Sequence, residues 1–223
     1  MKWNSRRDIL PAVVVVICIV FTALVWNSLP ATLPTHFAAD GTPNQFSPKT
    51  TAVILSLSMI AGLYLLLTFI PLLDPFWHRI EGKYNVFLIF RDIVVTFFAL
   101  FHIGMLYAAL TGKLQTAIVG TGIGLLLILL GNYLPRLPRN FFFGIRSPWT
   151  LASDVVWTKT HILSGWIFVC AGIVMIVLCL TGLNVGIVTL VTLLPTALFC
   201  AIIYPLVLYK KLQKEGKLLT PEL

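Results

Sequence analysis

Apolar residues occur along the chain in long uninterrupted runs and do not alternate with polar residues. At roughly 20 residues, each run is long enough for one helix across the hydrocarbon core of a bilayer. Continuous runs predict helices, because the strands of a membrane β-barrel alternate apolar and polar positions. The runs cover residues 10–29, 51–73, 86–110, 114–134, 161–183 and 185–209. We therefore expect an all-α, polytopic membrane protein with six transmembrane helices.

The composition excludes an ordinary soluble domain. Of the 223 residues, 58% are hydrophobic and 11% are charged, whereas soluble domains carry about 25% charged residues. The predicted spans leave only short loops, so a separate soluble catalytic domain is not expected. The four cysteines lie within apolar runs and form no C-x-x-C pair, which predicts packed thiols and no metal site. No cofactor is indicated.

The distribution of Lys and Arg predicts the orientation of the chain in the membrane. Of the 16 Lys and Arg residues, 14 lie at the two termini and in the second and fourth loops, beginning with Lys2, Arg6 and Arg7. Only Lys49 and Lys113 fall on the alternate side. Because positive charge concentrates on the cytoplasmic side, both termini are predicted to be cytoplasmic. The net charge of +8 therefore indicates orientation and contact with membrane lipids, and direct nucleic-acid binding is not predicted.

Two long loops divide the chain into two predicted modules. Residues 1–113 would form an N-terminal membrane module of three helices, with a long outer loop over residues 30–50. Residues 114–223 would form a C-terminal module of three helices, with a long cytoplasmic loop over residues 135–160. Long connections carry functional residues more often than short ones, so we look for candidate binding residues in these two loops.

The outer loop is rich in turn-forming residues. Asp40-Gly41 predicts a turn, and Ser47-Pro48 predicts the start of the second span. His36 and Asp40 would share a face if one helical turn separated them, giving either a metal half-site or a turn-stabilising hydrogen bond. Two ligands are too few for a metal site, so none is predicted. The candidate ligand-binding residues of this loop are His36, Phe37, Asp40 and Lys49.

The cytoplasmic loop mixes cations with aromatic residues, as expected of a segment in the lipid headgroup region. Ser153 followed by Asp154 predicts a helix start, after which Asp154, Trp157 and His161 recur on one helical stripe. Two interpretations remain open: a binding site along this stripe, or a structural role in which Arg146 pairs with Asp154 and caps the fifth span. The candidate residues of the cytoplasmic loop are Asn132, Arg146, Trp149, Thr150, Asp154, Trp157 and His161.

The ionisable residues do not form a recognisable catalytic arrangement. Asp154 and His161 are seven residues apart, about 10 Å along a straight helix, so the acid cannot orient the base directly. No Ser or Cys nucleophile stands at a suitable spacing, and an enzyme is not predicted. His102 and Arg91 share a face of the third span. That face indicates either a polar path of a transporter or enzyme, or packing in which His102 bonds a neighbouring helix.

The motifs of both loops resemble the sporulation-delaying-protein immunity (SdpI-like) family of bacterial membrane proteins. In the outer loop, the resemblance lies in Leu29-Pro30, Leu33-Pro34-x-His36-Phe37, Asp40-Gly41 and Ser47-Pro48-Lys49. In the second half, it lies in Gly131-Asn132-Tyr133-Leu134-Pro135, Asn140-Phe141-Phe142-Phe143-Gly144-Ile145-Arg146-Ser147-Pro148-Trp149-Thr150 and Trp157-x-x-Thr160-His161. Together these motifs extend over nearly the whole chain.

The resemblance implies a function that the residues alone do not. It implies a cell-membrane immunity protein whose partner is a secreted toxin peptide, recognised at the outer loop. In the founding system, the family also signals by holding a cytoplasmic transcriptional repressor at the membrane. We therefore expect toxin immunity, with repressor binding at the cytoplasmic loop as an additional role. The alternative is a membrane-embedded transporter or enzyme acting through His102 and Arg91 or through the His161 stripe.

Overall fold

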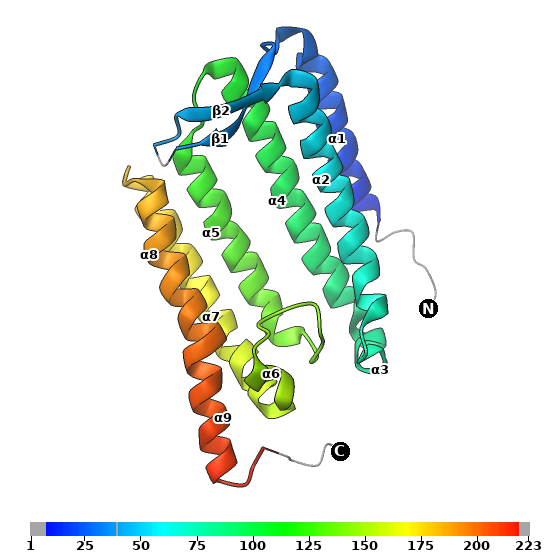
Figure 1. Ribbon diagram of the computed structural model, residues 1–223, viewed down its shortest axis with the longest axis vertical. Coiled ribbons are helices and arrows are strands. Elements are labelled where there is room, and N and C mark those ends of the chain that lie inside the picture. The colour runs from blue at the N-terminus through cyan, green and yellow to red at the C-terminus, as the bar shows by residue number, and fades with distance from the viewer. Residues whose placement is uncertain (1–7, 39, 219–223) are drawn as a thin grey trace.

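The computed structural model describes residues 8–38 and 40–218 (Figure 1). Within these residues, six helical segments are long and apolar enough to cross a bilayer, which confirms the predicted all-α fold with six transmembrane helices. They are Ile9–Ser28, Lys49–Leu73, Trp77–Thr111, Thr116–Arg136, Asp154–Leu180 and Val185–Lys214. Lys2, Arg6 and Arg7, which contribute to the predicted orientation, lie outside the described residues. The protein is a multi-pass membrane protein.

Three long helices form the N-terminal half. They are α1 (Ile9–Val25), which ends in the 3₁₀ turn η2 (Trp26–Ser28), α2 (Lys49–Phe69) and α4 (Tyr84–Thr111). The connection from α2 to α4 contains η3 (Ile70–Leu73), α3 (Trp77–Ile80) and η4 (Glu81–Lys83). Cys18 of α1, Ile60 of α2 and Val95 of α4 are buried in one cluster, so apolar packing holds the three helices together.

The C-terminal half contains the remaining spans. They are α5 (Thr116–Tyr133) with η5 (Leu134–Arg136), α7 (Asp154–Leu180), and α8 (Val185–Leu198) with α9 (Tyr204–Lys214); the short α6 (Pro148–Ala152) precedes α7. The helix start predicted at Ser153 is confirmed, because the Ser153 side chain accepts a hydrogen bond from the backbone N–H of Val156. The last span is irregular: Pro195 cannot donate a backbone hydrogen bond, and a π-helical turn, η6 (Phe199–Ile203), joins α8 to α9.

Glycines bring α5 and α7 into close contact. A Cβ atom added to Gly124 would lie 2.7 Å from the carbonyl oxygen of Gly172, and one added to Gly131 would lie 2.7 Å from that of Gly165. Any side chain at these positions would push the two backbones apart, which is the usual reason for small residues between membrane helices.

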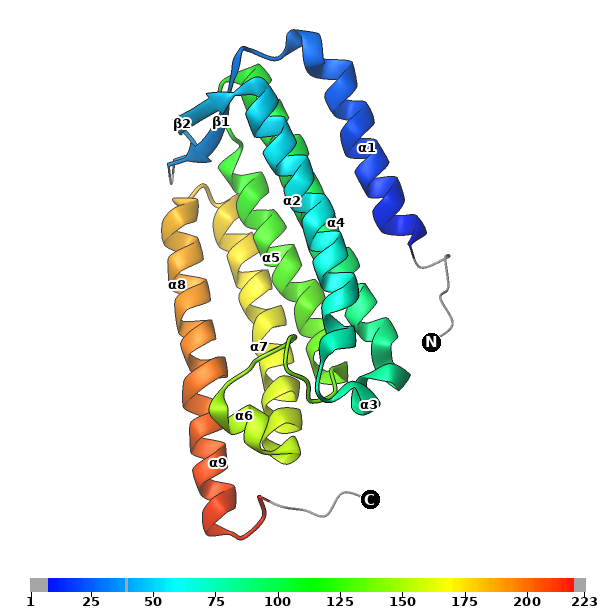
Figure 2. The same cartoon turned by 45° about the vertical axis from the view of Figure 1, so that its right-hand side comes forward.

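The outer loop is a β-hairpin rather than a helical turn. Strands β1 (Thr32–Phe37) and β2 (Pro43–Pro48) pair antiparallel around the predicted Asp40-Gly41 turn, in which Gly41 has φ +85°. The hairpin lies at the end of the bundle opposite α3 and α6 (Figure 2). Its tip touches the α4–α5 connection, where the backbone N–H of Leu114 donates to the carbonyl oxygen of Gly41 at 3.3 Å. We call this the hairpin end, and the opposite end the loop end.

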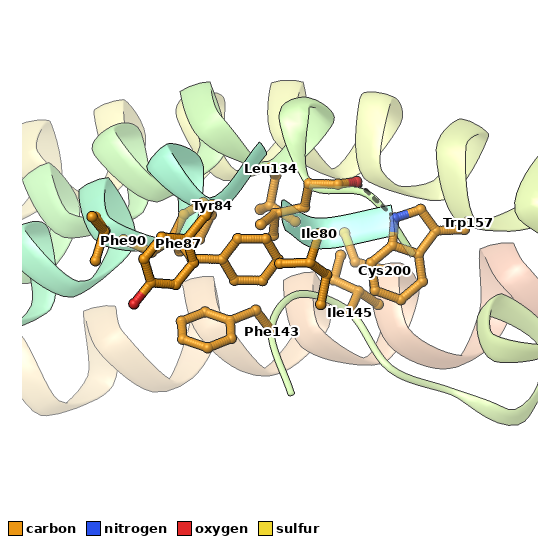
Figure 3. Packing of buried hydrophobic residues seen from close by; sticks show 11 residues of the cluster. Ile80, Tyr84, Phe87, Phe90, Leu134, Phe143, Ile145, Trp157 and Cys200 are labelled. Carbon is orange, nitrogen blue, oxygen red and sulfur yellow. Dashed lines mark hydrogen bonds between the residues drawn. The ribbon is translucent and has the colours of Figure 1, made fainter. Parts of the chain in front are cut away.

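A cluster of buried aromatic and aliphatic side chains joins the two halves at the loop end (Figure 3). Phe87 and Phe90 of α4 contact the ring of Phe143 edge-to-face, with centroid distances of 5.1 and 6.3 Å. Ile145 and Trp157 belong to the same cluster, so residues of the long 135–160 segment fill the space between the halves. That segment is therefore a packed part of the protein core.

Candidate functional site

The hairpin presents polar and aromatic side chains at its surface. The Nδ1–H of His36 donates to Oδ1 of Asn44 at 2.6 Å, across the two strands. From the sequence, we considered an interaction of His36 with Asp40. In the structure His36 binds Asn44 instead, because the chain is extended at His36. Phe46 is 58% exposed. Sequence reasoning missed both Asn44 and Phe46, because the strand pairing that places them was not foreseen.

Asp40 orders the hairpin turn. Its carboxylate accepts from the hydroxyl of Thr42 at 2.7 Å and from the backbone N–H of Thr42 at 2.9 Å. The Thr42 hydroxyl, helped by the backbone N–H, lowers the pKa of Asp40 below its ordinary value. The exposed Asp40 carboxylate therefore carries a negative charge on the hairpin tip at neutral pH.

Lys49 and Phe37 are less accessible than the other two candidates of the hairpin. The ammonium group of Lys49 donates to the carbonyl oxygens of Trp26 and Leu29, at 3.0 and 3.4 Å, and lies 4.6 Å from the centroid of the Trp26 ring. Lys49 thus anchors the hairpin to the end of α1, and Phe37 is half-buried. The accessible groups of this candidate site are His36, Asp40 and Phe46.

Trp157 and His161 form a buried clasp at the loop end. Their rings stack with centroids 4.0 Å apart, and the indole N–H of Trp157 donates to the carbonyl oxygen of Leu137 at 2.9 Å. His161 donates from Nδ1 to the carbonyl oxygen of Trp157 and accepts at Nε2 from the backbone N–H of Ile145. A carbonyl only accepts and an amide N–H only donates, so these partners fix a neutral ring with its proton on Nδ1.

The clasp depends on a glycine beside the histidine. Gly144 has φ +92°, and a Cβ atom there would lie 2.5 Å from Nε2 of His161. Three residues later, the Ser147 and Thr150 side chains and backbones cap α6 reciprocally. Thr150, a predicted site residue, is fully buried and also donates to the carbonyl oxygen of Ile145. The geometry of Thr150, Trp157 and His161 therefore indicates that these three residues stabilise the fold of this loop.

Among the described residues, Asp154 binds Arg79 and Arg139 and does not pair with Arg146. Its carboxylate lies 2.7 Å from Nη1 of Arg79 and 2.7 Å from Nε of Arg139. The proposed pairing of Arg146 with Asp154 is wrong, because the Arg146 guanidinium donates to the carbonyl oxygen of Phe141 at 2.8 Å. Arg79 comes from the short α3 segment of the other half, and spacing along the 135–160 segment gives no signal of it.

A second acid, missed at the sequence level, also joins the halves. Asp74 is 4% exposed, and its carboxylate accepts from the backbone N–H groups of Phe76 and Phe141, the latter at 2.6 Å. Of the remaining predicted residues, Asn132 and Arg146 are exposed and Trp149 is half-buried. The structure thus brings Trp157 and His161 together, pairs Asp154 with Arg79 and Arg139, and leaves Asn132 and Arg146 at the surface.

The ionisable groups of the third span have partners from neighbouring helices. His102 lies between the hydroxyls of Thr22 in α1, at 2.9 Å, and Ser56 in α2, at 2.8 Å. Arg91 is fully buried and contacts Asp8 and Asp92, each at 2.8 Å. Over residues 8–38 and 40–218, no group of three or more His, Cys, Asp or Glu side chains is suited to a metal ion.

Both candidate regions overlap segments that match known families. Residues 136–209 match the SdpI/YfhL protein family, and residues 13–61 match a domain of unknown function, DUF1648. The chain is also 24% identical over 208 residues to "Immunity protein SdpI" of Bacillus subtilis (strain 168), covering 93% of this chain and 98% of that protein. The resemblance to the SdpI-like family is confirmed. No solved structure matches the chain.

Each matched segment contains one of the two long loops together with membrane-spanning helices. The DUF1648 segment includes most of α1, the hairpin and the first part of α2. The SdpI/YfhL segment includes the Trp157–His161 clasp, α7, α8 and the first part of α9. The similarity to the Bacillus protein covers 93% of this chain, so it is not confined to one of the two segments.

Proposed function

We propose that the protein is a membrane immunity protein that recognises a secreted, membrane-active toxin peptide at its hairpin end. The proposal rests chiefly on the similarity to "Immunity protein SdpI", which extends over nearly the full length of both chains. The hairpin supports it, because His36, Asp40 and Phe46 offer a polar and aromatic surface that the bundle does not cover. Aromatic side chains are enriched where proteins bind one another, and polar groups form the rim of such surfaces.

A signalling role at the loop end forms a further part of the proposal. Phe141 is 50% exposed, and the exposed Arg146 side chain is held beside it by the hydrogen bond to its carbonyl oxygen. Aromatic residues and arginine are enriched where proteins bind one another. This pair is a suitable contact for a cytoplasmic repressor protein held at the membrane, provided that the loop end faces the cytoplasm.

The proposal requires the hairpin end to face outward, as the positive charges predict. We expect an impermeant maleimide applied to intact cells to label Asp40→Cys but not Ala152→Cys, in a variant without the native cysteines. Asp40 and Ala152 are both exposed, so a difference in labelling reports the side of the membrane and not burial within the fold. Labelling of Ala152→Cys after permeabilisation is the control. Equal labelling of both variants in intact cells would contradict the orientation.

The immunity role is tested in two strains. Deleting the gene from its host should make the host sensitive to culture medium of the undeleted parent, and expression in a Bacillus subtilis strain lacking its own SdpI should protect that strain from medium of its parent. Survival is measured together with the amount of protein in the membrane. The immunity proposal would be overturned if the deletion left survival unchanged and expression at normal abundance in the Bacillus strain also left survival unchanged.

The transporter or enzyme alternative has weaker support in the geometry. Its central residue, His102, holds α1 and α2 through hydroxyl partners on both ring nitrogens. Arg91 is enclosed by two carboxylates. These side chains are satisfied within the helix bundle, which is the usual way in which polar groups stabilise contacts between membrane helices.

A further inference from the structure

A long groove separates α4 from α5 between the two joined ends of the bundle. It has a volume of about 680 Å³, and nearly all of its surface is apolar. Its walls include the largely exposed side chains of Leu100 in α4 and of Ile118 and Leu125 in α5. The groove lies at the depth of the spans, so its occupant must come from within the bilayer.

The length of the groove indicates the kind of occupant. Along α4 its lining runs from Ile89 to Tyr107, which at 1.5 Å per residue is about 27 Å. The hydrocarbon core of a bilayer is about 30 Å thick, so one lipid chain, confined to its own leaflet, reaches only half of the groove. An occupant of matching length spans the membrane, and a peptide segment that does so must be helical to satisfy its backbone.

Two glycines in the lining leave room for close approach of a helix. No atom lies within 4 Å of a Cβ added to Gly104, and only the Phe97 ring, at 3.8 Å, lies near one added to Gly122. Gly124 and Gly131 of α5 have no such free space, because the backbone of α7 lies directly beside them. Small residues that face free space at membrane depth suit a helix that is not part of this chain.

The two ends of the groove differ in chemistry. At the loop end, Asp92 lines the groove, and Asp92 and Asp8 both contact the single guanidinium of the buried Arg91. Two carboxylates around one guanidinium leave a negative charge among these three side chains, which favours a cation on the occupant. At the hairpin end, the lining includes Leu114, whose backbone N–H binds Gly41 of the hairpin tip. One end of the groove therefore lies next to the hairpin tip.

We propose that this groove binds the membrane-spanning apolar helix of the toxin peptide, with a cationic residue of that helix near Asp92. This inference rests on the proposed immunity function and adds a second contact, within the bilayer, to the contact at the hairpin. A helix enclosed between α4 and α5 is kept out of contact with the bilayer lipids.

Photocrosslinking with a model helix tests the groove directly. The full chain, in phosphatidylcholine vesicles, carries benzoylphenylalanine at Leu125 in the groove or at Ile54, a lipid-exposed position of α2 outside it. The probe is a biotinylated leucine–alanine helix of about 23 residues with lysines at both ends. We expect about ten-fold more crosslinked peptide from Leu125 than from Ile54, which corresponds to about 1.4 kcal/mol of preference. A probe with glutamates at both ends should crosslink several-fold less.

Glycine variants supply matched controls. Gly104→Leu and Gly122→Leu fill the groove without a backbone clash and should abolish the preference for Leu125. Gly62→Leu places the same side chain in equally open space on α2, outside the groove, and should leave crosslinking unchanged. Equal peptide crosslinking at Leu125 and Ile54, crosslinking at Leu125 to lipid alone, or crosslinking to a second copy of the protein would each overturn the proposal.

The survival assay separates failure of the groove from failure of the immunity role. If Gly122→Leu loses peptide crosslinking and also loses protection at normal abundance, both proposals are supported. If Gly122→Leu protects as well as the unmodified protein, the groove proposal is wrong and the immunity role stands. If the unmodified protein itself gives no protection in either strain, the immunity role is wrong whatever the crosslinking shows.

Discussion

Replacing Trp157 by alanine is expected to destabilise the protein by about 3–5 kcal/mol, the usual cost of removing a large aromatic side chain from a core. Trp157 is 2% exposed, stacks on His161 and donates to the carbonyl oxygen of Leu137. Its removal leaves a cavity, an unpaired carbonyl and an unsupported histidine. The measurement is the thermal unfolding of the purified full chain in detergent, together with its abundance in the membrane.

Two other tryptophan variants control this experiment. Trp166→Ala removes the same side chain from the same helix at a position that is 70% exposed, and should change stability by less than about 0.5 kcal/mol. Trp157→Phe keeps an aromatic ring for stacking but loses the hydrogen bond to Leu137, so its loss of stability should be intermediate. Protection per folded molecule should stay near that of the unmodified protein in all three variants.

The opposite result would restore the binding-site interpretation of the loop. If Trp157→Ala accumulates and unfolds like the unmodified protein but no longer protects the cell or binds a repressor, the side chain serves recognition. The helical stripe of Asp154, Trp157 and His161, predicted from spacing, would then be a functional surface. In the structure, Trp157 and His161 are buried and Asp154 is engaged by two arginines.

The sequence predicted the features that depend on local chemistry. The spans follow from the length of the apolar runs, and the start of α7 follows from the capping ability of Ser153. The spacing of Trp157 and His161 correctly placed their rings on one face of that helix. Each of these predictions needs only residues that are neighbours along the chain.

Features that depend on distant residues could not be predicted in this way. One partner of Asp154 is Arg79, which lies 75 residues earlier in the chain. The interaction considered for His36 assumed a helical turn, whereas pairing with β2 makes the segment extended and gives His36 the partner Asn44. The hydroxyls that bind His102 come from two other helices. A single sequence has no local signal for such contacts, because any of several polar residues elsewhere could supply them.

The buried Arg91 of α4 also contacts residues that are distant in the sequence. Its removal should lower the stability of the protein by about as much as the removal of Trp157. Arg91 is fully buried, contacts Asp8 and Asp92, and donates to the Thr68 hydroxyl at 3.1 Å. Arg91→Met preserves much of the side-chain volume but leaves two carboxylates without their cation. Breaking a buried ion pair in this way costs about 3–5 kcal/mol. Thermal unfolding of the purified full chain in detergent measures the change.

A second substitution separates the charge effect from a packing effect. If the unpaired carboxylates cause the instability, adding Asp92→Asn to Arg91→Met should recover part of the lost stability, although Asp92→Asn alone removes a favourable contact. Arg146→Met removes an exposed arginine whose guanidinium donates to the carbonyl oxygen of Phe141, and should leave stability nearly unchanged. If Arg91→Met instead unfolds like the unmodified protein while transport of a solute into vesicles is lost, Arg91 belongs to a polar path. That result would favour the transporter alternative over a structural ion cluster joining α1 and α4.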